Sequence, residues 1–202
     1  MNREERIRNA IKPFVPNGTE VLLAAKIVGS RCHLTITKDR KSKAGDYRHP
    51  YGKSGHRISV NGSLNQYAFL ITFVHEMAHL VNWERHGRKV NPHGKEWKMA
   101  FQEEMQPFLK EAFFPIEILG QLRIHMRNPK SATVRDLELM RLLRSYDEPS
   151  DKVLLEDVPE NEEFLLGDKR FVKREKLRKR FRCELVGTGK VYLVSAIAEV
   201  EI

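Results

Sequence analysis

Cysteine is scarce in this chain of 202 residues, which contains only Cys32 and Cys183. Two thiols can form neither a disulfide framework nor a four-thiolate zinc site, so any metal must be bound by histidines and carboxylates. No apolar stretch approaches the roughly 18 residues that a transmembrane helix needs. The first apolar run, residues 21–28, contains Lys26, and residues 1–6 carry charges of both signs, which fits neither a signal peptide nor a transit peptide. We therefore expect a cytoplasmic protein that does not associate with membranes.

Acidic residues are fewer than basic ones, 27 against 36, which gives a net charge of +9. Residues 167–182 are strongly basic, with only Asp168 and Glu175 opposing nine cations: Lys169, Arg170, Lys173, Arg174, Lys176, Arg178, Lys179, Arg180 and Arg182. A smaller cluster comprises Lys38, Arg40, Lys41, Lys43, Arg48 and Lys53. Such clusters are typical of contact with a phosphate backbone, and we expect the nine cations to bind single-stranded DNA. A solvated strand face is an equally good interpretation.

Apolar periodicity predicts helices over residues 3–12, 20–28, 64–86, 94–105, 115–126 and 132–146. Alternating residues predict strands at 32–37 and 56–61, joined as a hairpin by a basic loop that contains glycine. After a polar linker at 146–151, the sequence predicts short strands with a turn at 187–189. This order predicts an α+β fold, in which a mainly helical domain with a small antiparallel sheet precedes a small C-terminal β module.

The longest predicted helix contains the sequence His75-Glu76-Met77-Ala78-His79. Residues four apart share one face of a helix, so these two imidazoles can bind one zinc ion from the same side. Glu76 stands beside them, where a carboxylate can accept a proton from the water on the metal. The alternative is a pair of solvated histidines with no role.

A catalytic zinc usually has a third protein ligand. His86 lies seven residues beyond His79, about 10 Å along the helix axis, which is too far for a bond of about 2 Å unless the helix breaks. His93 follows Gly87 and Pro92, where a reversing chain can return a side chain to the metal. We therefore choose His93, with Glu96 or Glu103 on the next helix as lesser alternatives.

Three segments, 58–61, 75–80 and 93–97, together resemble the SprT-like (Spartan-type) metalloprotease domain family, and the similarity extends to 37–40 and 45–48. The resemblance covers roughly residues 15–110. It implies a zincin-like fold, a zinc ion bound by His75, His79 and His93, and Glu76 as the catalytic base in peptide-bond hydrolysis. The best-known members degrade proteins covalently trapped on DNA. The resemblance thus implies a protein substrate, with single-stranded or damaged DNA as a further partner, and we expect a monomer.

Many members of that family carry a C-terminal zinc ribbon with two pairs of cysteines, whereas this chain has only Cys183 there. We expect residues 1–126 to form the SprT-like zinc metalloprotease domain and residues 127–150 a helical extension and linker. Residues 151–202 would form a basic β module, similar to a zinc ribbon without its cysteines and held by packing alone.

The expected function is that of a hydrolase, a zinc metallopeptidase of the HExxH type. By the same resemblance, the strand at 56–61 is the expected edge strand for an extended substrate. Tyr47, His56 and Arg48 are candidates to stabilise the oxyanion. The alternative function is a basic nucleic-acid-binding or regulatory protein in which zinc supports only the fold.

Overall fold

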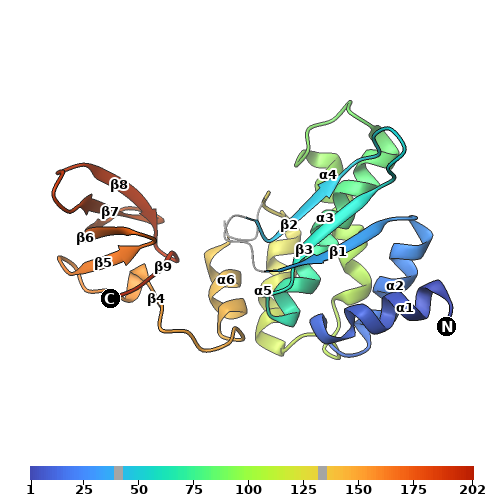
Figure 1. Cartoon of the computed structure of the whole chain (residues 1–202), viewed down its shortest axis with the longest axis horizontal. Helices are drawn as coiled ribbons and strands as arrows, with labels where there is room; N and C mark the ends of the chain where they lie inside the picture. Colours follow the sequence, from blue (N-terminus) through green and yellow to red (C-terminus); the bar gives the residue numbers. More distant parts are fainter. Residues whose placement is uncertain (39–42, 132–135) are drawn as a thin grey trace. The chain divides into compact units, whose positions relative to one another are not determined.

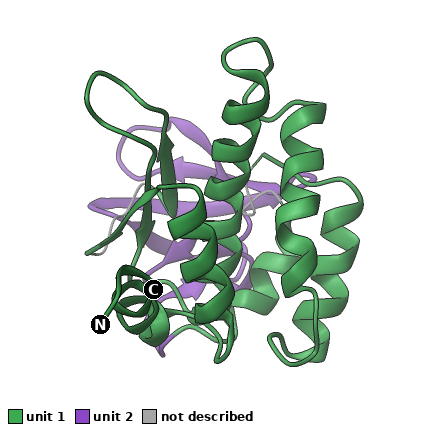
Figure 2. Cartoon of the chain, turned by 90° about the vertical axis from the view of Figure 1, so that its right-hand side faces the viewer, with its two compact units in different colours: residues 1–147 green, residues 148–202 purple. Residues whose placement is uncertain are grey.

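The computed structural model describes residues 1–38, 43–131 and 136–202. The chain divides into two compact units, residues 1–147 and 148–202, which Figure 2 colours separately. Each unit has its own hydrophobic core. Arg40 and Lys41 of the smaller basic cluster, and the first residues of the last predicted helix, lie outside the described residues.

The first unit is mainly helical (Figure 1). Its helices are α1 (Arg3–Ile11), α2 (Thr19–Gly29), α3 (Gln66–His86), α4 (Lys95–Met105), α5 (Ile116–Arg127) and α6 (Leu137–Arg144), with short 3-10 turns η1 (Lys12–Phe14) and η2 (Gln106–Phe108). These helices lie where the sequence predicts them, except that α6 begins only at Leu137, after its extended N-cap Asp136, and ends two residues before the predicted end. None of the described helices is both long and apolar enough to cross a bilayer.

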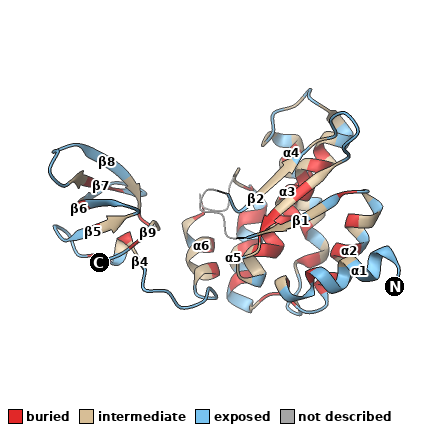
Figure 3. Ribbon diagram, viewed as in Figure 1, coloured by how far each residue is buried: buried red, intermediate tan, exposed pale blue. Residues whose placement is uncertain are grey.

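Helix α3 is the centre of the first unit, between the sheet and α4. It begins at Asn65, whose side chain accepts hydrogen bonds from the amides of Tyr67 and Ala68 and so satisfies two groups that a helix start leaves unpaired. Gly87, with a φ of 60°, follows its last residue. Figure 3 shows its buried residues in red, and they face both neighbours because α3 is covered on more than one side.

The sheet of the first unit is mixed, not antiparallel as predicted. Its strands are β1 (His33–Thr37), β2 (Gly45–Arg48) and β3 (Arg57–Asn61), in the order β1-β3-β2. β1 and β3 are parallel, so the predicted hairpin between them is wrong. The 19 residues that connect them are long enough for a crossover, and they contain β2, which pairs antiparallel with β3. β3 is therefore central, which makes the prediction of a substrate-binding edge at 56–61 wrong, and β2 lies at the edge of the described sheet.

The second unit is built from short strands. They are β4 (Val153–Leu154), β5 (Glu163–Leu166), β6 (Lys169–Lys176), β7 (Arg180–Leu185), β8 (Val191–Ser195) and β9 (Glu199–Val200), with a 3-10 turn, η4 (Leu155–Asp157), after β4. Strands β5 to β8 form an antiparallel meander, and β4 pairs with β9. Cys183 is buried in the apolar core together with Phe164, Phe171 and Phe181. Packing of this core holds the unit; its likeness to a zinc ribbon stays a prediction.

Candidate metal centre

Three histidines from two elements meet beside α3. His75 and His79 lie one turn apart on α3, with ring centroids 5.1 Å apart. His93 comes from the turn before α4, which closes with a hydrogen bond of 3.0 Å from the amide of Gly94 to the carbonyl of Asn91. The His93 ring lies 5.4 Å from that of His75 and 4.6 Å from that of His79. One ring nitrogen from each histidine lies within 4.8 Å of the other two, an arrangement that could hold a metal ion.

The other candidates for the third ligand do not join this cluster. In the described chain the three histidines are the one group of metal-ligating side chains that meets these distances. His86 is the last residue of α3, and Glu103 forms an ion pair of 2.7 Å with Arg85. Both cysteines are buried, and burial raises the pKa of each thiol to about 11, so neither supplies a thiolate at neutral pH.

The surroundings of His75 and His79 keep these two imidazoles neutral. Trp97 is fully buried, and its ring lies 4.6 Å from His75, 5.3 Å from His79 and 4.8 Å from His93. Burial, with smaller effects from the nearby imidazoles, lowers the pKa of His75 to about 3 and that of His79 to about 4. Neutral imidazole is the form that binds a metal, and a set of imidazole donors suits zinc and other transition metals. The residues therefore fit a metal ion.

The backbone of strand β2 passes very close to the side chain of Glu76. Its side chain is 8% exposed. A Cβ atom added to Gly45 would lie 2.7 Å from Oε1 of Glu76 and 2.7 Å from Cγ2 of Thr72, far closer than real contacts allow. Glycine at position 45 is thus what lets β2 cross the carboxylate so closely. The sequence shows this glycine, but its contact depends on packing between segments 31 residues apart.

A cavity of about 960 Å³ opens along α3 and is lined by His75, Glu76, His79 and His93. Strand β2 forms one wall and runs in the same direction as α3. Gly45 lies against Thr72 and Glu76, the Tyr47 ring lies 6.4 Å from that of His79, and farther on His49 stacks on Trp83 at 4.1 Å. Strand β2 and His49 thus follow α3 from Thr72 to Trp83, past the histidine cluster.

Asn82 is a polar residue of this cavity that the sequence did not single out as functional. It lines the cavity and is 5% exposed, and its Oδ1 atom has no hydrogen-bond partner among the described residues. A buried acceptor of this kind is costly unless something donates to it. The signal available in the sequence is its position one turn beyond His79, on the same face of α3.

Of the three oxyanion candidates, all of them within the described residues, Tyr47 lines the cavity. Its hydroxyl lies 2.9 Å from Nδ1 of His56, and Nε2 of His56 lies 3.6 Å from a carboxylate oxygen of Glu84. Burial, with the nearby Cys32 and Glu84, raises the pKa of Tyr47, so its hydroxyl stays protonated. Arg48 is exposed and binds Asp46 at 3.0 Å. Tyr47 is therefore the candidate that the geometry favours.

One cation of the basic run in the second unit, Lys173, is buried and cannot contact a nucleic acid. Lys173 is 4% exposed, because the alternation of β6 turns it inward. Its Nζ donates to the carbonyls of Glu156 and Val158 and lies 4.0 Å from the Phe181 ring. Lys173 is thus excluded from the predicted nucleic-acid contacts. Phe171 and Phe181 are buried in the core and are not available for stacking on bases.

Other cations of the run are paired with acids. Arg170, Arg174 and Arg182 form ion pairs with Glu163, Glu184 and Glu175 at distances of 3.2, 2.8 and 3.0 Å, respectively. Of the other exposed cations, Lys176, Arg178, Lys179 and Arg180 lie around the turn between β6 and β7, whereas Lys169 lies at the opposite end of β6. Residues 148–202 contain 11 basic and 12 acidic residues, whereas residues 1–147 contain 25 and 15. The net positive charge therefore belongs to the first unit, although the basic run at residues 167–182 suggested the second.

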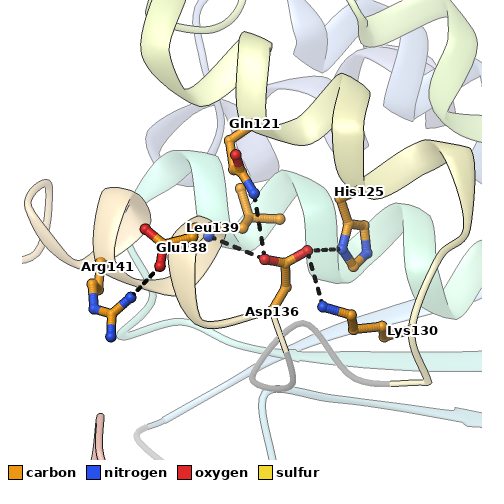
Figure 4. Close-up of polar contacts among 7 residues, drawn as sticks. All are labelled: Gln121, His125, Lys130, Asp136, Glu138, Leu139 and Arg141. Carbon is orange, nitrogen blue, oxygen red and sulfur yellow. Dashed lines mark hydrogen bonds and ion pairs between the residues drawn. The ribbon is translucent and has the colours of Figure 1, made fainter. Parts of the chain in front are cut away.

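A fully buried histidine, His125, lies between α5 and α6, whereas the three clustered histidines are half-buried (Figure 4). Nδ1 of His125 is 2.8 Å from Oδ2 of Asp136, and Lys130 Nζ is 3.5 Å from the same oxygen. The other oxygen of Asp136 accepts from the amide of Leu139 at 3.4 Å, which caps α6. Burial raises the pKa of Asp136, but these hydrogen bonds and the charge of Lys130 outweigh it, so the net direction is lower. Sequence reasoning missed this pair because nothing local couples two residues 11 apart.

Comparison with known proteins adds one result. The model of the SprT-like family matches residues 22–117. This segment contains the three histidines and Glu76, and it excludes α6 and the second unit. No curated protein and no solved structure matches the chain.

Proposed function

Because residues 22–117 form a SprT-like domain, we propose that this protein is a zinc-dependent, zincin-like metallopeptidase that hydrolyses peptide bonds in protein substrates. The observation that carries the proposal is the meeting of three imidazoles and a buried carboxylate in one cavity. His75, His79 and His93 would hold the ion. A zinc ion held there would supply Lewis-acid chemistry, polarising the scissile carbonyl and making water a better nucleophile.

Each remaining residue has a role that follows from its position. Glu76 takes the proton of the attacking water and passes it to the leaving amine. The free edge of β2 pairs with the extended substrate, and the buried Oδ1 of Asn82 accepts a backbone N–H of the substrate. The protonated hydroxyl of Tyr47 donates to the oxygen on which charge develops.

A purely structural zinc is less well supported. A structural site is closed by four protein ligands, whereas the described residues bring together three histidines that line an open cavity. A structural site also has no use for a carboxylate buried beside its first ligand. These features support an enzyme over the alternative in which the metal only stabilises the fold.

The test compares wild type with Glu76→Gln on an unfolded protein such as casein, and on a histone with and without single-stranded DNA. We expect the variant to keep its zinc and to lose activity by about a thousandfold, because the proton acceptor is gone. Glu103→Gln, at an exposed residue of α4, is the matched control and should behave like wild type. Equal activity of wild type and Glu76→Gln, both carrying zinc, would refute the proposal.

We propose in addition that the exposed cations around the turn between β6 and β7 contact single-stranded or damaged DNA. The support is the grouping of Lys176, Arg178, Lys179 and Arg180, all exposed, at one turn. Binding through phosphates weakens steeply with salt. Arg178→Glu combined with Arg180→Glu should weaken binding and flatten its salt dependence, while Lys190→Glu, on another turn, should not. Unchanged binding by the double variant would refute the assignment.

A further inference from the structure

The cavity has two chemically different ends. Past the histidines, toward the start of α3, it is lined by an apolar set that we call the apolar end: Leu64, Ala68, Ile71, Met140 and Leu143. Toward the end of α3 the lining is aromatic and polar, with His49 stacked on Trp83 and the guanidinium of Arg88 lying 5.8 Å from the Trp83 ring. The histidine cluster and Glu76 lie between the two ends.

We infer that the apolar end is the subsite for a large apolar side chain on the substrate residue that follows the cleaved bond. This inference rests on the proposed peptidase function and names its specificity. Met140 and Leu143, two of the five residues of the apolar end, come from α6, outside the residues that match the family model.

The direction of the substrate follows from the wall formed by β2. β2 and α3 run the same way, as the successive contacts of Gly45, Tyr47 and His49 along α3 show. A peptide added antiparallel to β2, the commoner and slightly stronger pairing, therefore runs from the Trp83 end toward the Ala68 end. Its residues after the cleaved bond then lie at the apolar end.

The charges of the cavity support an apolar occupant. Among the described residues, the charged side chains in the lining besides Glu76 are Lys43, Asp46 and Arg88. Lys43 and Asp46 form an ion pair of 2.9 Å with each other, and Arg88 lies near Trp83 at the opposite end. At the apolar end, the described lining residues offer a charged substrate side chain no unpaired charge, so the water it loses there would be costly. An aliphatic or aromatic side chain would be stabilised by burial.

Helix α6 is attached by hydrogen bonds to its neighbours in the first unit, so the wall that it forms at the apolar end has a defined shape. Nδ2 of Asn65 donates to the carbonyl of Leu143 at 2.9 Å and to Asp147 at 2.6 Å. Asp136 ties the first turn of α6 to His125, as Figure 4 shows. Just after α6, the hydroxyl of Tyr146 binds Glu117 of α5 at 2.5 Å. Three attachments in and beside a helix of eight residues hold Met140 and Leu143 against the cavity.

The first arm of the test uses a peptide panel that varies only the residue after the cleaved bond, with cleavage sites read by mass spectrometry. Wild type should cleave the leucine peptide at least about 30-fold more efficiently than the aspartate peptide. Met140→Lys should reverse this preference by supplying an ammonium group to the subsite. Met99→Lys, on an exposed residue of α4, should leave the preference unchanged.

The second arm does not need activity. Zinc-loaded protein is titrated calorimetrically with two succinyl hydroxamates that carry an isobutyl or a carboxymethyl group beside the zinc-binding end. The isobutyl compound should bind at least about tenfold more tightly, and Met140→Lys should abolish the difference. If this preference is seen but no peptide is cleaved, the subsite stands and the proposed function fails. Equal binding of the two compounds, no binding of either, or equal cleavage across the panel would overturn the subsite.

Discussion

The first unit surrounds histidines in two different ways: His125 lies against a carboxylate, whereas His75, His79 and His93 lie against one another. His125 is paired with the carboxylate of Asp136, with Lys130 beside it and the capping amide of α6 on the other oxygen. His75 lies nearby, since the Phe101 ring contacts both histidines, but burial and neighbouring imidazoles lower its pKa. An imidazole paired with a carboxylate between two helices stabilises their packing. Neutral imidazoles clustered on a cavity are instead suited to binding a metal ion. Burial alone therefore does not identify a functional histidine; its partners do.

The largest expected effect is on zinc affinity, which should depend on the cluster of His75, His79 and His93 and not on the pair of His125 and Asp136. His93→Ala should weaken zinc binding by more than about 100-fold, because removing a ligand costs at least as much as removing a residue that orients one. His86→Ala, at the end of α3, is the matched control and should bind zinc like wild type. Zinc affinity measured by competition with a chelator checks both variants. If His93→Ala bound zinc as tightly as wild type, the contrast between ligating and structural histidines would be wrong.

The second prediction concerns stability. His125→Ala should lower the free energy of unfolding by about 3 kcal/mol, because it leaves the buried carboxylate of Asp136 without its main partner. The zinc stoichiometry of the folded variant should stay the same. Urea unfolding of the metal-free protein provides the measurement, with His33→Ala, at an exposed residue of β1, expected to change stability by less than about 0.5 kcal/mol. A loss of zinc by folded His125→Ala would show that the two groups are not distinct.

The third prediction tests the carboxylate beside the triad. Gly45→Ala should lower kcat by roughly tenfold or more, because its methyl group must displace Glu76 or Thr72 from contacts of 2.7 Å and small displacements of a catalytic group are costly. Zinc affinity should change little, since no histidine is displaced. Gly55→Ala, where no atom lies within 4 Å of the added methyl group, is the control. Wild-type kcat in Gly45→Ala would contradict the close approach.

The smallest expected effect is on acid stability. The pKa of Asp136 is lowered in the folded state, so its contribution is present above the unfolded pKa of about 3.9 and is lost as the pH falls through the lower folded value. Asp136→Asn should therefore be less stable than wild type at pH 6, and the difference should shrink as the pH falls below 4. Urea unfolding of both proteins across this range checks the sign. A gap that widens in acid would contradict the pairing.

Local patterns predicted the helices and the meeting of His75, His79 and His93 well. The spacing of His75 and His79 is a property of one helix, and the reversal that brings in His93 follows from Gly87 and Pro92. Long-range pairing was harder. Two alternating segments do not say whether they run parallel, and β2, with only four residues, shows little alternation of its own. The site residues that escaped prediction, Gly45 and Asn82, depend on the same tertiary packing.

The distribution of charge along the sequence also led to a wrong expectation about the surface of the second unit. A basic run in the sequence suggested a basic surface, but strand alternation buries Lys173, and glutamates on paired strands neutralise Arg170 and Arg174. The acidic residues that precede β5 offset the rest of the run. Sequence distance does not show which charges meet across a sheet, because strand register decides it.

A zinc titration of metal-free protein, with zinc binding and peptide hydrolysis followed in the same sample, tests the central claim most directly. We expect hydrolysis by wild type to rise with added zinc and to level off at one ion per chain. Glu76→Gln should bind one ion equally well and remain inactive. Hydrolysis that does not depend on zinc, or a Glu76→Gln variant as active as wild type at full zinc occupancy, would contradict the account.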